Sequence, residues 1–264
     1  MSGEYEIYAI HYGHHDRPAH ENFASGDPHD DGPMPLDYFV WAIVSGGRTF
    51  VLDTGFGPDM AAKRGRKLVR PVADGLKAIG VDPATVSDVI ISHMHYDHAG
   101  NIPLFPGARF HIQDAEMEFV TGRCMCDAGT RAFFEADHAA HMVHRLFEGR
   151  VQFHDGESEL APGITLHHVG GHTKGLQVVR VNTQRGHVVL ASDAAHLYAN
   201  MEREDPFPIF HDRNDYLAAF TTIRKLATSE AHIIPGHDPL VLARYPAAKS
   251  GLAGVVRLDA DPKG

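Results

Sequence analysis

The segment that most constrains this chain is residues 91–101, which read ISHMHYDHAGN. It follows a short apolar run that is typical of a buried strand. Residues two apart in an extended segment point the same way, so His93 and His95 are expected to present both imidazoles to one ion. Asp97 and His98 are expected where the chain turns into a helix, facing a second ion. The segment therefore predicts a site for two metal ions.

The ligand chemistry narrows the choice of metal. Neutral imidazole together with carboxylate suits zinc and other borderline divalent ions. Paired divalent ions are a known device for hydrolysis, because they lower the pKa of a bound water. Histidine is also in excess, at 21 of 264 residues. The histidines at positions 11, 14, 15, 20 and 29 lack metal-ligand order and are interpreted as surface or structural groups.

Three more candidate ligands follow apolar runs further along the chain. His172, Asp193 and His237 each come just after a predicted strand. Side chains at strand ends on one edge of a sheet can converge, as binding groups in α/β folds commonly do. One histidine at a strand end is usually structural, but four ligand-rich strand ends in one chain favour a single shared site.

Charge and cysteine content limit the partners and the compartment. The 24 basic and 34 acidic residues give a net charge of −10, which argues against a protein that binds nucleic acid through its phosphates. The only cysteines, Cys124 and Cys126, are too close for an unstrained disulfide and are expected to be free thiols. No export signal or membrane span is recognisable. A reduced, cytoplasmic setting is expected, with no membrane partner and with the oligomeric state left open.

The hydrophobic pattern predicts alternating groups of strands and helices. Strands are expected at residues 4–12, 38–44, 49–52, 89–91, 108–112, 151–153, 164–169, 178–181, 188–191 and 231–234. Helices are expected at residues 59–65, 71–79, 114–121, 129–146 and 212–228. This order favours an α+β class in which two sheets pack face to face with helices outside. Residues 1–264 are interpreted as one domain, and the helical insertion at about 113–148 either packs on the body or covers the site.

The motif Asp53-Thr54-Gly55 closes one of these predicted strands and has two interpretations. The carboxylate of Asp53 either stabilises a turn or hydrogen-bonds the metal loop or a ligand imidazole.

Taken in order, these motifs resemble the metallo-β-lactamase superfamily across residues 38–239. The matching stretches are VLDTG at 51–55, SHMHYDHAG at 92–100, GHTKG at 171–175, SD at 192–193 and PGH at 235–237. The resemblance implies an αβ/βα sandwich of two mixed sheets with a dinuclear site on one edge. It also implies two divalent ions per chain, with zinc the first expectation and manganese, iron or cobalt as alternatives.

Carried over residue by residue, the resemblance assigns seven ligands. His93, His95 and His172 would hold the first ion; Asp97, His98 and His237 would hold the second; Asp193 would bridge them. A histidine at position 95 and an aspartate at position 193 resemble the lactonase, glyoxalase II and phosphodiesterase branches.

The N-acyl homoserine lactonase-like group is the best match in size, in ligand set and in the long helical segment. Those lactonases typically carry a tyrosine three residues after the bridging aspartate, whereas this chain has His196, with Tyr198 two residues later. His196 and Tyr198 are therefore catalytic candidates. His196 is expected to donate a hydrogen bond or to protonate the leaving alkoxide, and a solvent-facing histidine is the alternative. Asp97 is expected to orient the nucleophile and to shuttle a proton.

The leading hypothesis is a hydrolase that uses a metal-bridging hydroxide to open a lactone or related small cyclic ester. A glyoxalase II-like thioesterase is the nearest alternative, although that family relies on a basic C-terminal helical domain and residues 240–264 are short for one. A phosphodiesterase or a catalytically silent metal-binding protein is further away.

Overall fold

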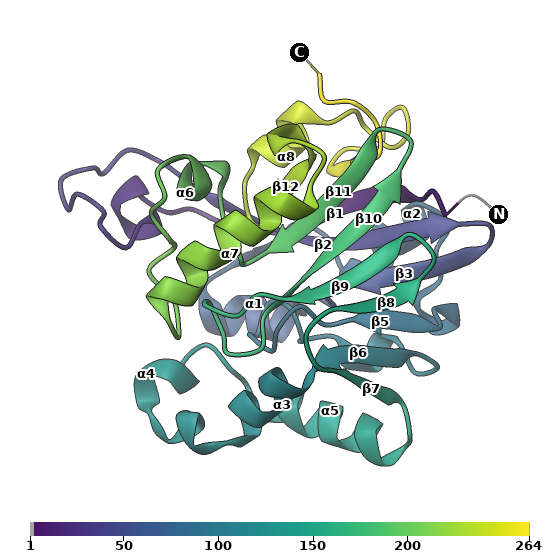
Figure 1. Ribbon diagram of the computed structural model, residues 1–264, viewed down its shortest axis with the longest axis horizontal. Coiled ribbons are helices and arrows are strands. Elements are labelled where there is room, and N and C mark those ends of the chain that lie inside the picture. The colour runs from purple at the N-terminus through teal and green to yellow at the C-terminus, as the bar shows by residue number, and fades with distance from the viewer. Residues whose placement is uncertain (1–2, 264) are drawn as a thin grey trace.

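The computed structural model describes residues 3–263, which form two β-sheets with helices on their outer faces (Figure 1). The eight-stranded first sheet has the order β13-β1-β2-β3-β5-β6-β7, with β4 paired to β1. Its strands are β1 Glu6–His15, β2 Leu36–Ser45, β3 Arg48–Leu52, β4 Lys67–Leu68, β5 Asp88–Ile90, β6 Arg109–Gln113, β7 Val151–His154 and β13 Val255–Arg257. The five-stranded second sheet has the order β12-β11-β10-β9-β8. Its strands are β8 Ser158–Ala161, β9 Ile164–His168, β10 Gln177–Thr183, β11 Gly186–Ser192 and β12 Ile233–Pro235.

Both sheets are mixed, and their parallel pairs matter most for function. In the first sheet β3, β5, β6 and β7 pair in parallel, so the chain leaves β3 and β5 at the same edge. In the second sheet β11 and β12 are parallel, with Leu190 opposite Ile234. Parallel strands end together, which brings the segments that follow β3, β5, β11 and β12 to one edge of the sandwich.

The helices form the two outer layers. They are α1 Pro58–Arg64, α2 Val72–Ala78, α3 Asp114–Thr121, α4 Ala128–Arg131, α5 Ala136–Phe147, α6 Tyr198–Glu202, α7 Arg213–Leu226 and α8 Leu240–Arg244. Short 3₁₀ turns lie at Ala19–Asn22, Pro83–Thr85, Ile102–Leu104, Arg123–Cys126 and Glu230–His232. In Figure 1, α3, α4 and α5 gather beside β6 and β7, whereas α7 lies across the second sheet.

Alternation along the strands divides the core into three layers. Trp41 and Leu190 lie in the cluster between the two sheets, and both side chains are fully buried. Val40 points the other way, into a cluster shared with α2, α3 and α5. Phe220 of α7 packs on the outer face of the second sheet. The αβ/βα sandwich expected from the sequence is therefore confirmed.

The structure corrects the predicted helix at residues 129–146. It is divided into α4 and α5, and residues 132–135 between them are not helical. The carbonyl oxygen of Phe133 accepts a hydrogen bond from the amide of Tyr96, at 2.9 Å, which a continuous helix would use internally. The break therefore lets the helical segment attach to the metal-ligand loop.

The structure also corrects the helix expected at Asp97 and His98. These residues form a tight turn in which the amides of His98 and Ala99 bond to the carbonyl of His95, at 3.0 and 3.2 Å. The strands β4, β8 and β13 were not predicted, because each is short and lacks a long apolar run.

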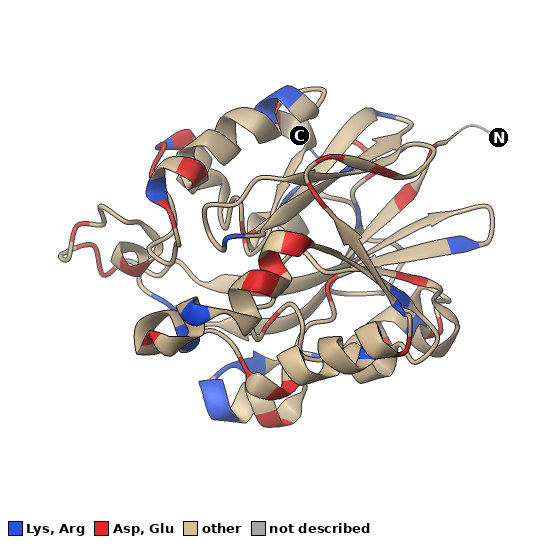
Figure 2. Cartoon of the chain, turned by 60° about the horizontal axis from the view of Figure 1, so that its bottom comes forward, with Lys and Arg blue, Asp and Glu red and all other residues tan. Residues whose placement is uncertain are grey.

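Residues of both charges are interspersed along the helices and loops, as the colouring of Figure 2 shows. None of the helices in residues 3–263 is long and apolar enough to cross a lipid bilayer. Cys124 and Cys126 are free thiols, as expected.

Candidate metal centre

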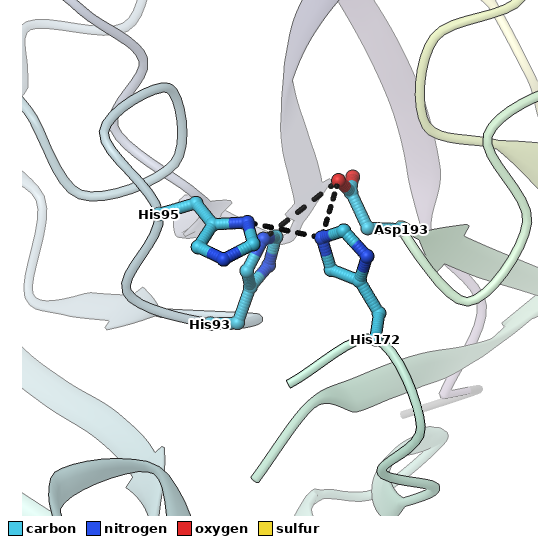
Figure 3. A group of neighbouring side chains, drawn as sticks. All are labelled: His93, His95, His172 and Asp193. Carbon is cyan, nitrogen blue, oxygen red and sulfur yellow. Dashed lines mark hydrogen bonds and ion pairs between the residues drawn. The ribbon is translucent and has the colours of Figure 1, made fainter. Parts of the chain in front are cut away.

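His93, His95, His172 and Asp193 converge at the edge of the sandwich (Figure 3). His93 and His95 lie in the loop after β5, His172 lies between β9 and β10, and Asp193 follows β11. The Oδ2 atom of Asp193 is 3.1 Å from Nε2 of His172 and 3.7 Å from Nε2 of His93. Nδ1 of His95 is 3.0 Å from Nε2 of His172. All four side chains are buried.

A second group lies on the other side of the same carboxylate. The Oδ1 atom of Asp193 is 3.1 Å from Nε2 of His98 and 2.9 Å from Nε2 of His237. Asp97 adds its Oδ2 atom at 3.4 Å from Nε2 of His98. The two oxygens of Asp193 thus face two different sets of ligands, which is the arrangement that a bridging carboxylate requires.

The donor atoms fit a pair of divalent cations. The Nε2 atoms of His93 and His98 are buried and, although carboxylate oxygens lie nearby, neither makes a well-aligned hydrogen bond with the described residues, which is costly for a buried nitrogen. Burial lowers the pKa of His93 well below its usual value, which keeps the imidazole neutral and able to bind a metal. Burial also opposes a charge on His98, but the carboxylates of Asp193, Asp97 and Asp53 outweigh it and raise its pKa. The site therefore favours positive charge.

Protein groups behind the ligands fix the direction of their rings. Nδ1 of His98 lies 2.7 Å from Oδ2 of Asp53, and Nδ1 of His172 lies 2.6 Å from the carbonyl oxygen of Ile209. Nδ1 of His237 lies 3.0 Å from the carbonyl oxygen of Asp37. Each contact directs the opposite nitrogen, Nε2, into the site.

Asp53 makes the contacts of a group that supports the metal site. Its Oδ1 accepts a hydrogen bond from the amide of Ser92 at 2.7 Å, and its Oδ2 accepts one from the Ser92 hydroxyl at 2.8 Å. The backbone of Asp53 has a φ of 62°, which is uncommon for residues other than glycine. Of the two interpretations of Asp53, these contacts agree with the second, in which its carboxylate hydrogen-bonds the metal loop and a ligand imidazole.

Glu116 ties the two histidine loops together and was not singled out in the sequence. From the first turn of α3 its Oε1 accepts a hydrogen bond from the amide of Met94, at 2.7 Å. Its Oε2 accepts bonds from the Thr173 hydroxyl at 2.7 Å and from the Gly175 amide at 3.0 Å. Burial raises its pKa despite these donors. One buried carboxylate therefore holds the loop of His93 and His95 against the loop of His172.

His196 is buried beside Asp193, so it is not a solvent-facing histidine. Its Nε2 lies 3.0 Å from Oδ2 of Asp193, and its Nδ1 lies 2.9 Å from the hydroxyl of Tyr216. That hydroxyl donates its only proton to the carbonyl of Asp193, at 2.6 Å, so Nδ1 of His196 must be the donor in the second contact. The lone pair of the neutral ring is then on Nε2. Burial lowers the pKa of His196 to about 3, so the neutral ring prevails.

The position of Tyr198 differs from the expectation. Tyr198 lies at the start of α6, in the cluster between the sheets, with the Arg244 guanidinium 3.9 Å above its ring. It does not line the cavity that contains Asp193 and His196. The expected catalytic role of Tyr198 therefore finds no support in this position.

Two neighbouring hollows open onto the ligands. The first, of about 110 Å³, is lined by five of the seven candidate ligands, together with His196, Phe207 and three arginines. The lining ligands are His95, Asp97, His172, Asp193 and His237. The second, of about 520 Å³, is mainly apolar and shares His95, Phe133 and His172 with the first. Phe119 and Phe134, from the helical segment after β6, form one of its walls.

Curated relatives align with 62% to 72% of this chain. An N-acyl homoserine lactonase of Bacillus thuringiensis is 30% identical over 165 residues, which are 62% of this chain and 60% of the relative. The N-acyl homoserine lactonase AiiB of Agrobacterium fabrum is 29% identical over 217 residues, which are 72% of this chain and 75% of the relative. The alignment with the Bacillus protein thus leaves about two fifths of that relative unmatched.

Solved structures share the fold over nearly the whole chain. A quorum-quenching N-acyl homoserine lactone lactonase superposes with a TM-score of 0.75 at 22% identity, covering 96% of this chain and 97% of the other. A probable metal-dependent hydrolase from Staphylococcus aureus gives a TM-score of 0.74 at 14% identity, covering 100% and 97%.

The family assignment extends across the sandwich and the ligand loops alike. Residues 34–237, from just before β2 to the last candidate ligand, match the family described as the metallo-beta-lactamase superfamily. The resemblance seen in the sequence motifs is thereby confirmed, and the chain belongs to the metallo-β-lactamase superfamily.

Proposed function

We propose that this protein is a dinuclear metal hydrolase that opens a lactone or a related small cyclic ester. The observation that carries the proposal is the division of Asp193, whose Oδ2 faces His172 and whose Oδ1 faces His98 and His237. Curated relatives named as N-acyl homoserine lactonases support the substrate class.

Each ion would have its own set of ligands. His93, His95 and His172 would hold one ion, Asp97, His98 and His237 would hold the other, and Asp193 would contribute to both. When bound, two such ions lower the pKa of a water between them toward neutrality and polarise a carbonyl group. Zinc is the first choice, because imidazole and carboxylate ligands suit it.

In the first step of hydrolysis His196 is proposed to accept a proton, and it donates that proton only later. The lone pair of the neutral ring is on Nε2, 3.0 Å from Oδ2 of Asp193, because Nδ1 donates to Tyr216. A proton taken up at Nε2 from the attacking water is then available to the leaving alkoxide, and the Asp193 carboxylate 3.0 Å away stabilises the imidazolium. Asp97 also lines the cavity and is the second candidate for holding the nucleophile.

The apolar hollow is proposed to receive the acyl or aromatic part of the substrate. Phe119, Phe133 and Phe134 contribute to it from the helical segment at about 113–148, which supports the idea that this segment covers the site. We regard residues 1–264 as one domain of the family, with this segment as part of it. The free thiols of Cys124 and Cys126 agree with a reducing, cytoplasmic compartment.

A hydrolysis screen tests the proposal. Metal-loaded protein is assayed with lactones of varied ring and acyl size, with thioesters, with phosphodiesters and with β-lactams, and chelator-stripped protein is the control. We expect metal-dependent turnover of lactones above the other classes. Preferred turnover of thioesters would support the glyoxalase II-like alternative, and turnover that survives removal of metal would contradict the proposal.

A further inference from the structure

Three arginines lie around the cavity of the metal centre. Arg17 precedes the first 3₁₀ turn, while Arg64 and Arg66 flank Gly65 at the end of α1, and all three line the same cavity as Asp193. The chain as a whole is acidic, with a net charge of −10. Three guanidinium groups beside one small cavity therefore form a local concentration of positive charge in an acidic molecule, and negative groups are expected to balance them.

The three arginines differ in how their charge is balanced. Arg64 has an acidic partner, because its Nη2 lies 2.6 Å from the carboxylate of Glu135, which Lys63 shares at 2.7 Å, and its Nη1 donates to the carbonyl of Ala132 at 2.6 Å. Arg17 is only partly balanced by the half-exposed Glu21, whose carboxylate is 3.4 Å from Nε. That buried Nε has no hydrogen-bond partner among the described residues.

Arg66 has no acidic partner within residues 3–263. Its contacts are all neutral: Nε donates to the hydroxyl of Tyr96 at 3.2 Å, and Nη1 donates to the carbonyl of Arg64 at 2.8 Å and meets Nε2 of His15 at 3.1 Å. Burial, followed by the charges of Arg66 and Arg17, lowers the pKa of His15 to about 4, so that ring is neutral. No hydrogen bond of normal geometry occupies Nη2 of Arg66 in the described part of the chain, and the hydroxyl of Tyr38, another neighbour of the guanidinium, is neutral as well.

These contacts hold Arg66 rigidly but do not compensate its charge. A partly buried cation without a counter-ion is costly, whereas a guanidinium with ordered neutral neighbours is pre-organised for an anion. If Arg66 only joined α1 to the loop of Tyr96, a nearby carboxylate would be expected to balance its charge. Arg64 has such a partner in Glu135. The difference between the two neighbouring arginines points to a ligand.

Arg17 places a second guanidinium group at the same cavity. Its guanidinium carbon is 4.8 Å from the centre of the Phe207 ring, and Phe207 stacks on His196 with ring centres 3.8 Å apart. This stack connects Arg17 with the imidazole beside Asp193. Nη2 of Arg66 and the guanidinium of Arg17 thus place two cationic donor groups at one cavity, and a carboxylate has two oxygens to accept from them.

We propose that the substrate opened at this metal centre carries a carboxylate, which Arg66 and Arg17 bind at the rim of the cavity. This inference rests on the proposed lactone hydrolysis and narrows its substrate class to acidic lactones. It makes Arg66 a specificity-determining residue. A cavity lined by positive groups also concentrates anionic substrates, so the preference decreases as ionic strength rises.

The test uses two probes that differ only in charge. One is γ-butyrolactone with a carboxylate on its γ-carbon, and the other is the carboxamide of the same lactone. We expect the metal-loaded enzyme to favour the carboxylate by about tenfold or more in kcat/KM, since bonds to charged groups contribute that much. Arg66→Gln should reduce kcat/KM for the carboxylate by about tenfold to hundredfold, mainly through KM, and change the value for the carboxamide less than about threefold.

Control variants separate recognition from folding. Arg109→Gln removes one positive charge from an exposed position at the start of β6 and should leave the preference unchanged. Arg66→Lys keeps the charge and should retain part of the preference, and thermal midpoint and metal content verify that each variant is folded. If Arg66→Gln does not fold, Arg17→Gln provides the second test, with the same expected loss for the carboxylate alone.

A binding experiment keeps this inference separate from the proposed function. The ring-opened hydroxy dicarboxylate and its mono-amide are titrated into metal-loaded protein by calorimetry. Tighter binding of the dicarboxylate, by about tenfold and lost in Arg66→Gln, supports the inference even if neither lactone is hydrolysed. Equal binding of the two compounds, no binding of either, or equal kcat/KM for the two lactones would overturn it, even if lactone hydrolysis itself is established.

Discussion

Replacing Glu116 by glutamine tests whether one buried carboxylate holds the metal loops together. A glutamine side chain has one acceptor oxygen and one NH₂ group. If its oxygen keeps the bonds from Thr173 and Gly175, its NH₂ group faces the amide of Met94, which now lies 2.7 Å from the carboxylate. Two donors then oppose each other in a buried position, and at least one charge-assisted hydrogen bond is lost.

The expected cost follows from these contacts. A buried amide without its acceptor costs about 1–3 kcal/mol, and bonds to a charged group contribute about 1.5–3 kcal/mol each. Glutamine also removes the burial cost that raises the pKa of Glu116, so we expect a net loss of about 2–3 kcal/mol in the free energy of unfolding. For a chain of 264 residues this corresponds to a fall in Tm of about 4–8 °C. Metal affinity should decrease by about tenfold to hundredfold, because the ligands lose their fixed orientation.

Glu118 provides a matched control on the same helix. Its side chain is 70% exposed and lies 3.5 Å from the ammonium group of Lys174. Glu118→Gln should therefore change the free energy of unfolding by less than about 1 kcal/mol. Urea denaturation and metal titration of chelator-stripped protein measure both variants. Equal stability and equal metal affinity in Glu116→Gln and Glu118→Gln would refute the role assigned to Glu116.

Three further predictions concern other contacts. Asp53→Asn should weaken binding of one metal ion more than of the other, by about tenfold to hundredfold, because the carboxylate lies 2.7 Å from Nδ1 of His98; stepwise metal titration checks this, and equal weakening of both ions would contradict it. Tyr216→Phe should lower kcat while metal content stays the same, because Nδ1 of His196 loses its acceptor; unchanged kcat would remove His196 from the mechanism. Burial, and then His111, lower the pKa of His154 to about 4 from about 6.5, so the unfolded chain binds more protons between these values. The free energy of unfolding therefore keeps its full contribution from neutral His154 above pH 6.5 and loses it as pH falls toward 4. In His154→Gln the fall in the free energy of unfolding over this pH window, measured by urea denaturation, should be smaller by about 1 kcal/mol after allowance for partial exposure. An unchanged dependence of the free energy of unfolding on pH would contradict this prediction.

The sequence predicted the parts of the site that carry local signals. His93, His95 and His172 follow apolar strands, and their order along the chain matches a family motif. The fold was predictable for the same reason, because strands with alternating buried residues such as Trp41 are recognisable without a structure. Asp53 was recognisable as a carboxylate at a strand end, but its contact with His98 required the fold.

Groups that act across the fold left no local signal. Glu116 lies 57 residues before Thr173 and 22 residues after Met94, and only the closed sandwich brings these three together. Tyr216 reads as one more apolar position on α7, although its hydroxyl sets the tautomer of His196. Arg66 reads as one charge in a polar segment, and its lack of an acidic partner among residues 3–263 is visible only when its neighbours are known.

The histidines near the N-terminus show how a small irregularity defeats pattern reading. His11 and His14 are an odd number of residues apart and should point to opposite faces of a strand. A register shift between His11 and Gly13 moves both to one face, where they lie 3.2 and 2.7 Å from the carboxylate of Asp37. A β-bulge cannot be located from the alternation that it interrupts.

The most direct test of the central claim is the number of metal ions that each chain binds. Protein purified without chelator and supplemented with zinc is analysed for metal content by elemental analysis, with Asp193→Asn as the comparison. The two-sided arrangement of Asp193 predicts two ions per chain in the wild type and fewer in the variant. One ion or none in the supplemented wild-type protein would contradict the dinuclear site.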